Sequence, residues 1–126
     1  MKIRESQEMY LETILLLKNR SGYVRSVDVA EELGYSRASV SRAVNLLAMN
    51  GDIVIAKSGE ITLTEAGEMR AHSIYERHEL ITRVLMELGA DAELAEDNAC
   101  RIEHVISDDL FALLKRYFEK KDGEIE

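Results

Sequence analysis

Hydrophobic residues in the first half of the chain recur at helical spacing in three segments, and glycine-containing turns separate these segments. The spacing predicts amphipathic helices over residues 7–19, residues 27–33 and residues 37 to about 50. Gly34-Tyr35 leaves room only for a sharp turn between the second and third helices, as in a helix-turn-helix unit. Short polar residues precede each segment, and the expected N-caps are Ser6, Ser26 and Ser36.

A different pattern follows, in which two short runs rich in β-branched residues, 52–56 and 60–63, flank Lys57-Ser58-Gly59. This pattern predicts a β-hairpin. Helical spacing then returns in three segments that begin near residues 65, 91 and 108; their expected N-caps are Thr64, Asp91 and Ser107, and the middle helix is expected to run to about Ile106. The order of elements predicts a mainly α protein with a small β-hairpin: a winged helix-turn-helix domain over residues 1–64, then a helical domain over residues 65–126.

The distribution of charge also changes near Thr64. The 126 residues include 16 Lys and Arg and 24 Asp and Glu, for a net charge of −8, and the whole excess of acid lies after residue 64. An acidic protein is a poor electrostatic match for nucleic acid. However, no acidic residue occurs from Leu33 to Gly51, where Arg37 and Arg42 lie. The third predicted helix can therefore present an acid-free surface.

The second helix of a helix-turn-helix unit places the side chains of its first turns in the major groove of DNA. There Arg can donate two hydrogen bonds to guanine, and Ser can contact phosphate or base edges. One chain supplies few cations and would bind DNA phosphates only weakly. We therefore expect a homodimer that contacts two half-sites of a palindromic operator. A helical hairpin with a solvated polar face is the alternative. The expected DNA-binding residues are Ser36, Arg37, Ala38, Ser39, Ser41, Arg42, Lys57 and Ser58.

Residues that can ligate a metal occur at helical spacing in both halves of the chain. Cys100, Glu103 and His104 stand at i, i+3 and i+4, which predicts one face of one helix. Each candidate also has an ordinary explanation, such as core packing for a methionine or cysteine and solvent exposure for a glutamate. A thiolate, a carboxylate, an imidazole and a thioether that converge would bind a transition metal. The candidates are Met9, Glu12, His78, Cys100, Glu103 and His104.

With these residues the chain resembles the diphtheria-toxin-repressor family of metal-dependent transcription repressors, which has iron-sensing and manganese-sensing branches. The resemblance covers essentially the whole chain; residues 99–107 (ACRIEHVIS) are its most specific part, and residues 8–11, 36–44 and 77–80 also match. It implies a winged-helix DNA-binding domain followed by a helical metal-binding and dimerisation domain. The chain resembles the two-domain form, without the SH3-like domain that many iron-sensing members add.

The resemblance also implies a role for each candidate ligand. Glu12 matches a ligand of the manganese-sensing branch, and His78 matches a ligand of a second metal site in the iron-sensing branch. At two other positions of that second site the chain has Thr82 and Glu96 in place of a carboxylate and a histidine, so Glu96 is a further candidate. The matches to the primary activating site of the iron-sensing branch are Met9, Cys100, Glu103 and His104.

Ligand chemistry then favours iron, because thiolate and thioether ligands prefer Fe²⁺ or later metals over Mn²⁺. We expect Fe²⁺ as the effector, with Mn²⁺ as the alternative and with Co²⁺, Ni²⁺ and Zn²⁺ also binding in vitro. Our hypothesis is that a metal held by Met9 and Glu12 together with the ligands of the second domain fixes the orientation of the two domains. The spacing of the two DNA-binding helices in a dimer would then depend on the metal.

Other functions fit parts of the pattern: a winged-helix regulator that senses an organic ligand, a small metalloenzyme, or an interaction module that does not bind DNA. An open-site motif such as H-E-x-x-H does not occur, so we do not expect an enzyme. The single cysteine, Cys100, excludes an intramolecular disulfide and suits the reducing cytoplasm. No apolar segment is long enough to span a membrane. We expect neither a membrane partner nor an organic substrate.

Overall fold

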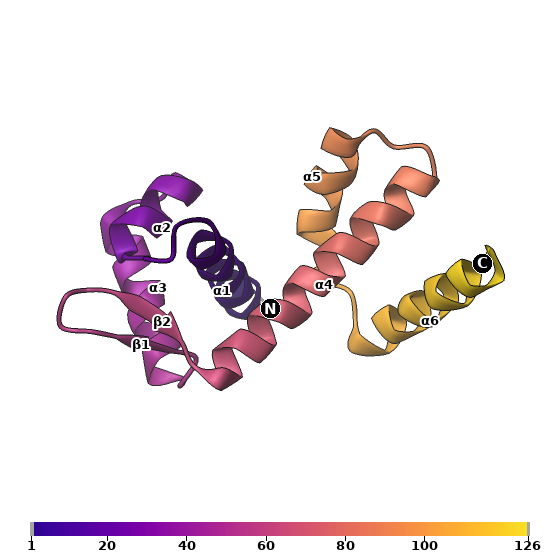
Figure 1. Ribbon diagram of the computed structural model, residues 1–126. Helices are drawn as coiled ribbons and strands as arrows, with labels where there is room; N and C mark the ends of the chain where they lie inside the picture. The colour runs from indigo at the N-terminus through magenta and orange to yellow at the C-terminus, as the bar shows by residue number, and fades with distance from the viewer. Residues whose placement is uncertain (1, 126) are drawn as a thin grey trace. The chain divides into compact units, whose positions relative to one another are not determined.

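The structure is a computed structural model that describes the backbone of residues 2–125 and the side chains of residues 7–121. The chain divides into an N-terminal unit (Met1–Tyr75) and a C-terminal unit (Glu76–Glu126), and one long helix contributes to both. Within the described residues the elements, in chain order, are α1 (Lys2–Ser21), α2 (Ser26–Leu33), α3 (Arg37–Met49), β1 (Ile53–Ile55), β2 (Ile61–Leu63), α4 (Glu65–Glu87), α5 (Ala92–Ile102) and α6 (Asp108–Ile125) (Figure 1).

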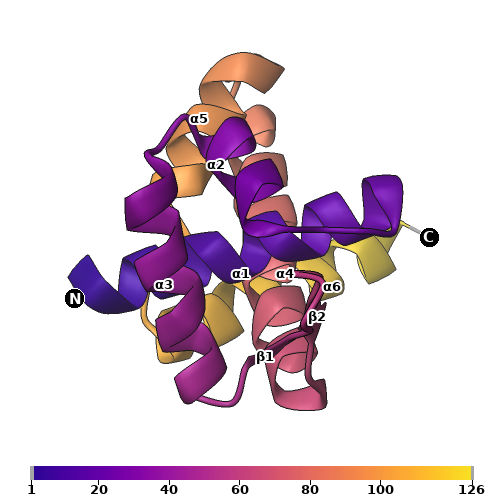
Figure 2. The ribbon, with the colours of Figure 1, turned by 90° about the vertical axis from the view of Figure 1, so that its left-hand side faces the viewer.

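The core of the N-terminal unit forms around α1, which packs against α2, α3 and β2 (Figure 2). Leu11 and Ile14 of α1 and Val40 of α3 are fully buried in this core. The apolar stripes predicted from helical spacing therefore face one another, as a helix-turn-helix unit requires. Buried residues of the other elements complete the core: Val24, Val29, Ala30, Val44, Leu47, Ile53, Ile61, Leu63 and Ala71.

The predicted hairpin is confirmed, with strands of three residues each. β1 and β2 are antiparallel and pair Ile53 with Leu63 and Ile55 with Ile61. Ile53, Ile61 and Leu63 are buried whereas Val54 is exposed, which is the alternation expected of a two-stranded sheet with one face on a core. The hairpin thus attaches to the helix-turn-helix unit through one apolar face, and its tip projects as a wing.

Four of the expected helix caps are confirmed, because each side-chain oxygen accepts a backbone N–H of the first turn; these caps are Ser36, Thr64, Asp91 and Ser107. The prediction that Ser26 caps the second helix is wrong. Arg25 is the N-cap of α2, and its backbone N–H donates to the Asp28 carboxylate at 2.8 Å. The first helix begins at Lys2, five residues earlier than predicted from the apolar spacing, so Ser6 lies inside it; the side chain of Ser6 is outside the described residues.

The start of α4 is held against the hairpin in the N-terminal unit. Thr64 Oγ1 donates to the carbonyl of Gly51 at 2.7 Å, and the Arg70 guanidinium pairs with the buried Asp52 carboxylate. Gly67 lies so close to the backbone that a Cβ atom there would be 1.9 Å from the Asp52 carbonyl oxygen. The first turns of α4 therefore belong to the N-terminal unit, which extends to Tyr75.

The helix that was expected to run from Asp91 to about Ile106 is shorter than predicted. α5 ends at Ile102, and a turn of residues 103–107 connects it to α6. In this turn the backbone N–H groups of Val105 and Ile106 both donate to the carbonyl of Ile102, at 3.0 Å. The prediction that Cys100, Glu103 and His104 share one helix is thus wrong for the last two, which follow the helix.

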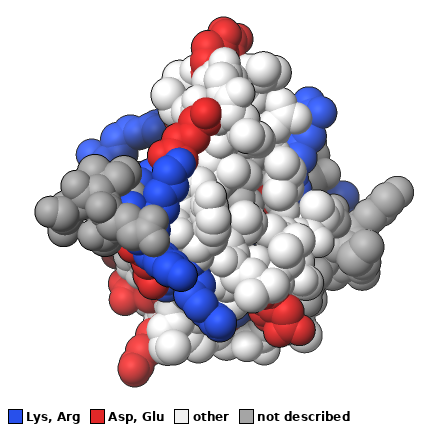
Figure 3. All heavy atoms as spheres, turned by 90° about the vertical axis from the view of Figure 1, so that its right-hand side faces the viewer, with Lys and Arg blue, Asp and Glu red and all other residues white. Residues whose placement is uncertain are grey.

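The C-terminal unit packs α6 along α4, with Phe118 of α6 buried. Lys115 and Lys121 of α6 form ion pairs with Glu76 and Glu87 of α4, at 3.1 and 3.2 Å. Another side of α6 carries exposed apolar side chains. The side chains of Leu110, Leu113 and Tyr117, at i, i+3 and i+7, are more than half exposed. Figure 3 shows a face on which residues other than Lys, Arg, Asp and Glu cover most of the surface.

Candidate functional site

Three potential metal ligands gather in the C-terminal unit. His78 comes from α4, Cys100 from α5, and Glu103 from the residue directly after α5. The Nδ1 atom of His78 lies 2.8 Å from a carboxylate oxygen of Glu103 and 3.8 Å from the sulfur of Cys100. One ligand atom of each residue lies within 4.8 Å of those of the other two. Three predicted ligands from separate parts of the sequence therefore meet.

Glu103 is the centre of this cluster. It is fully buried, and its two carboxylate oxygens face different imidazoles: Oε2 faces His78 Nδ1, and Oε1 lies 3.2 Å from Nε2 of His104. Burial of a carboxylate is costly unless hydrogen bonds or cations compensate it. Cys100, in contrast, is exposed. The cluster thus combines a carboxylate shielded from water with a thiol that solvent can reach.

These donors fit a transition metal. Imidazole nitrogen, thiolate sulfur and carboxylate oxygen are all ligands of divalent first-row metals. Ligand atoms that are each about 2.0–2.3 Å from a common ion lie at most about 4.6 Å apart. The ligand atoms of His78, Cys100 and Glu103 lie within 4.8 Å of one another, which is close to this limit. When bound, a metal there would be held by His78, Cys100 and Glu103.

Two other predicted positions in this unit have different surroundings. His104 is mostly buried and adjoins the cluster through Glu103. Glu96 is exposed on α5, and it is absent from the groups of ligand atoms found among the described residues of the C-terminal unit. Thr82, which takes the place of a carboxylate ligand of the related family, is half-buried on α4.

The predicted ligands Met9 and Glu12 lie one turn apart on α1, in the N-terminal unit. Both side chains are half-buried, and Met9 packs against the hydrophobic core of that unit. The hydroxyl of Tyr35 donates a hydrogen bond to the Met9 sulfur at 3.8 Å. Tyr35 also meets the ring of Tyr10 edge-on, with ring centroids 6.4 Å apart. A metal-ligand candidate and the turn of the helix-turn-helix unit are therefore in direct contact.

One residue at the cluster has no counterpart among the residues predicted from sequence. Arg77 precedes His78 on α4 and is buried, and its guanidinium donates to the Glu103 carbonyl at 3.3 Å. An arginine in a charged helix is usually solvated, so residue type and spacing gave no signal for it. Arg77 could have been recognised only by knowing that α5 ends before Glu103.

The predicted DNA-binding residues of α3 lie on its exposed side, with one exception. The turn before α3 contains Gly34 in the left-handed conformation, with φ of 70°. Ser36 then caps the helix by accepting the Ser39 backbone N–H at 3.1 Å, and the two hydroxyls lie 2.9 Å apart. Ser39 is half-buried. The exposed residues at this end of the helix are Ser36, Arg37, Ala38, Ser41 and Arg42.

The tip of the hairpin is also exposed, as expected. Lys57 and Ser58 lie between the strands, and the Ser58 hydroxyl accepts the Glu60 backbone N–H at 3.3 Å. This hydrogen bond closes the turn and leaves the Lys57 ammonium facing solvent. Lys57 can thus contact a phosphate without rearrangement of the hairpin.

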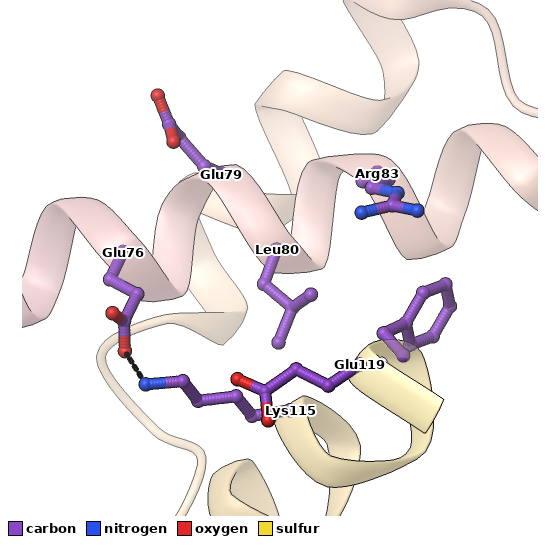
Figure 4. A pocket seen from close by; sticks show the side chains of 7 residues that line it. Glu76, Glu79, Leu80, Arg83, Lys115 and Glu119 are labelled. Atoms are coloured by element: carbon purple, nitrogen blue, oxygen red, sulfur yellow. Dashed lines mark hydrogen bonds and ion pairs between the residues drawn. The ribbon is translucent and has the colours of Figure 1, made fainter. Parts of the chain in front are cut away.

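A separate pocket of about 250 Å³ lies between α4 and α6 in the C-terminal unit (Figure 4). Its lining residues are Glu76, Glu79, Leu80, Arg83, Lys115, Phe118 and Glu119, and the Lys115–Glu76 ion pair crosses one side of it. None of the lining residues is a metal-ligand candidate. The pocket is therefore distinct from the cluster at Glu103.

No helix within the described residues is both long and apolar enough to cross a membrane.

Two family models match most of the chain. Residues 2–60 match the N-terminal DNA binding domain of the iron dependent repressor, and residues 64–122 match its metal binding and dimerisation domain. The HTH-type transcriptional regulator MntR of Lysinibacillus sphaericus is 36% identical over 102 residues, which span 81% of this chain and 73% of that protein. The chain belongs to the iron dependent repressor family. This family consists of metal-dependent transcriptional repressors, in agreement with the expectation that the protein is not an enzyme.

Two further relatives are longer than this chain. The diphtheria toxin repressor of Corynebacterium diphtheriae is 33% identical over 107 residues, which cover 84% of this chain but 47% of that protein. The structure of the manganese regulator SloR superimposes with a TM-score of 0.79 at 29% identity, and it covers 90% of this chain and 53% of that one. The chain thus spans about half the length of these two relatives.

Proposed function

We propose that the protein is a repressor that binds palindromic operator DNA as a homodimer when Fe²⁺ is bound. The observation that carries this proposal is the cluster of His78, Cys100 and Glu103 in the domain that matches the metal binding family. The other half of the chain matches the DNA binding domain of the same family and exposes Arg37 and Arg42 on α3. Metal site and DNA-binding helix are thus carried by different units of one chain.

The preference for iron rests on the sulfur of Cys100. A thiolate is a softer ligand than a carboxylate and favours Fe²⁺ over Mn²⁺, which prefers oxygen donors. The alternative effector, Mn²⁺, is supported by the carboxylates Glu12 and Glu103 and by the relative that is a manganese regulator. Because Zn²⁺ binds most nitrogen and sulfur sites more tightly than either metal, affinity alone does not identify the effector.

The proposed ligands have two kinds of support. His78, Cys100 and Glu103 are supported by their mutual distances, and His104 by its contact with the Glu103 carboxylate. Met9 and Glu12 are proposed from their ligand chemistry, their spacing on α1 and the resemblance to the family, and Glu96 is the least supported because it is exposed.

We further propose that the N-terminal half of α3 enters the major groove, with Arg37 and Arg42 donating to bases or phosphates and Lys57 contacting the backbone. Ser36, Ala38, Ser39, Ser41 and Ser58 complete the proposed contact surface. Of these, Ser36 and Ser39 already bond to one another, so their hydroxyls are better placed to shape the start of α3 than to specify a base.

The apolar side of α6 is the surface that we propose for the homodimer. Leu110, Leu113 and Tyr117 are more than half exposed there, in the domain that matches the dimerisation family. Isolated exposed apolar residues are ordinary on protein surfaces, but a stripe on one helix face is typical of an interface. One chain offers few cations to DNA, and a dimer would double their number.

Metal control requires that the metal-loaded protein bind DNA more tightly than the metal-free protein. A difference of about 100-fold corresponds to a coupling free energy of about 2.7 kcal/mol, which is within the usual range for allosteric proteins. By linkage, operator DNA then raises the affinity for the metal by the same factor. Measuring the metal affinity with and without operator DNA therefore tests the coupling.

Selection of DNA from a random duplex library tests the proposal and identifies the operator in the same experiment. The library is incubated anaerobically with the full chain in the presence of Fe²⁺, in the presence of Mn²⁺, or with a chelator. We expect a palindromic motif to be enriched with Fe²⁺ and not with the chelator. Equal enrichment in all three arms would favour the alternative of a winged-helix regulator that senses another ligand.

The choice between the two metals has its own test. Met9→Asp replaces the thioether by a carboxylate, so the ratio of Mn²⁺ affinity to Fe²⁺ affinity should rise if Met9 is a ligand. Leu16→Asp, at an exposed position of the same helix, is the matched control. An unchanged ratio in Met9→Asp would remove Met9 from the ligand set and leave it as a core residue.

A further inference from the structure

The turn that carries Glu103 and His104 lacks the support of a regular helix. α5 ends at Ile102, and after Glu103, whose N–H donates to the Ala99 carbonyl at 2.9 Å, the backbone N–H groups of residues 104–106 form only turn hydrogen bonds to Arg101 and Ile102. A carboxylate that must hold a metal needs a fixed backbone, because a small displacement of the ligand weakens coordination. The carbonyls of Glu103 and Ile106 accept hydrogen bonds from outside the turn, which help to fix it.

Arg77 of α4 supplies the missing contacts. One guanidinium nitrogen, Nη1, donates to the carbonyl of Glu103 at 3.3 Å and to the carbonyl of Ile106 at 3.1 Å. The other, Nη2, pairs with the carboxylate of Asp108 at the start of α6. The same group lies over the ring of Phe111, 5.4 Å from its centroid. Arg77 thus connects both ends of the turn to α4.

The next residue of α4, His78, contacts the side chain of Glu103, whereas Arg77 contacts its backbone. Two consecutive residues of one helix therefore hold both the carbonyl and the carboxylate of the same glutamate. Because Arg77 is itself buried, its guanidinium has little freedom to release the turn. A planar guanidinium presents several donors in a fixed geometry, which a lysine ammonium does not.

We propose that Arg77 is a positioning residue of the metal centre, which acts through the backbone of Glu103 and His104. This inference rests on the proposed function, since it assumes that Glu103 ligates a metal. It goes beyond the ligand set because Arg77 offers only positive charge and donor hydrogens, and so cannot be a ligand. Its charge would disfavour a neighbouring cation, and the Asp108 carboxylate offsets that effect.

Co²⁺ is a suitable probe, since its visible absorption reports the coordination geometry and its near-ultraviolet absorption reports a thiolate ligand. The full chain and its variants are titrated anaerobically with Co²⁺, and the thermal midpoint of the metal-free protein is measured in parallel. Arg77→Lys keeps the charge and loses the fork of donors; Arg77→Met loses both. Arg101→Met, at an exposed arginine of α5, is the control for loss of a surface charge.

We expect the Co²⁺ dissociation constant to rise about tenfold in Arg77→Lys and by up to about 100-fold in Arg77→Met, the range typical of residues that orient metal ligands. The visible spectrum at saturating Co²⁺ should change in both variants and stay unchanged in Arg101→Met. A purely structural role would lower the thermal midpoint without changing the spectrum. If Arg77→Met does not fold, Arg77→Lys decides, because it preserves the buried charge.

The positioning role of Arg77 and the metal centre itself are overturned by different results. If the wild-type chain binds Co²⁺ with a thiolate absorption band, but Arg77→Lys matches it in both dissociation constant and spectrum, the positioning role is overturned and the metal centre stands. If the wild-type chain does not bind Co²⁺, both the metal centre and the role of Arg77 are overturned.

Discussion

The imidazole of His78 and the carboxylate of Glu103 lie 2.8 Å apart although 25 positions separate them in the sequence. This contact joins α4 to the turn after α5 and brings the thiol of Cys100 into the same cluster. A buried carboxylate that meets two imidazoles and a neighbouring thiol is an unusual arrangement for a purely structural core. The metal-dependent function that we propose rests on this arrangement.

Loss of a single ligand should remove the response to metal. Cys100→Ala and His104→Ala are expected to abolish metal-dependent operator binding, since the remaining donors hold the ion too weakly for effective coupling. Cys100 is exposed and its removal leaves no cavity, so the thermal midpoint of the metal-free protein should change little. Operator binding with and without the metal measures the first effect, and thermal unfolding followed by circular dichroism measures the midpoint. A normal metal response in either variant would contradict the site assignment.

Arg42 provides the complementary prediction for DNA. Its side chain is exposed on α3, away from the metal cluster in the sequence, so Arg42→Ala should weaken operator binding by about 1–3 kcal/mol while metal affinity stays unchanged. Fluorescence anisotropy with a labelled duplex measures the first effect, and metal titration the second. Arg20→Ala, at an exposed arginine on α1, serves as the control. Reduced metal affinity in Arg42→Ala would count against separate roles for the two units.

The close contact of Gly67 with Asp52 gives a prediction for stability. A methyl group at position 67 would lie 1.9 Å from a backbone carbonyl oxygen, so Gly67→Ala must separate α4 from the hairpin. We expect a loss of about 1–3 kcal/mol in the free energy of unfolding, as is usual for overpacking. Denaturant titration measures this loss. Ser73→Ala, at an exposed position of α4, should change the stability by less than about 0.5 kcal/mol.

Tyr10 makes the stability of the N-terminal unit sensitive to alkaline pH. Burial, and to a lesser extent the neighbouring Tyr35, raise the pKa of Tyr10 above its usual 10.0. Above pH 10 the unfolded chain loses this proton more readily than the folded chain, so the free energy of unfolding falls as the pH rises. Tyr10→Phe should flatten this dependence, whereas Tyr23→Phe, at an exposed tyrosine, should not. Equal pH profiles for wild type and Tyr10→Phe would refute the assignment.

Much of the fold follows from local sequence. The caps at Ser36, Thr64 and Asp91 were predictable because each is a short polar residue before an apolar helical pattern, and the cap hydrogen bond involves only neighbours. The hairpin was predictable for a similar reason, since its turn and its alternation are local. The cap of α2 was not, because Asp28 inside the helix accepts the Arg25 backbone N–H and makes Ser26 part of the first turn.

The candidate site was only partly predictable. Spacing placed Cys100 and Glu103 near one another and could not show that α5 ends at Ile102. Arg77 donates to carbonyls of the following turn that lie 26 and 29 positions away in the sequence. A long-range contact of this kind has no periodicity of its own. For the same reason, spacing gave no signal for Arg77 as a functional residue, although it lies beside a predicted ligand.

The affinity for the selected operator duplex measures control of DNA binding by the metal most directly. It is determined anaerobically at one salt concentration, with Fe²⁺ and with a chelator, for the wild-type chain and for Cys100→Ser. We predict that Fe²⁺ tightens binding by the wild type about 100-fold and leaves binding by Cys100→Ser nearly unchanged. Equal affinities of the wild type with Fe²⁺ and with the chelator would contradict a metal-dependent repressor that responds to iron.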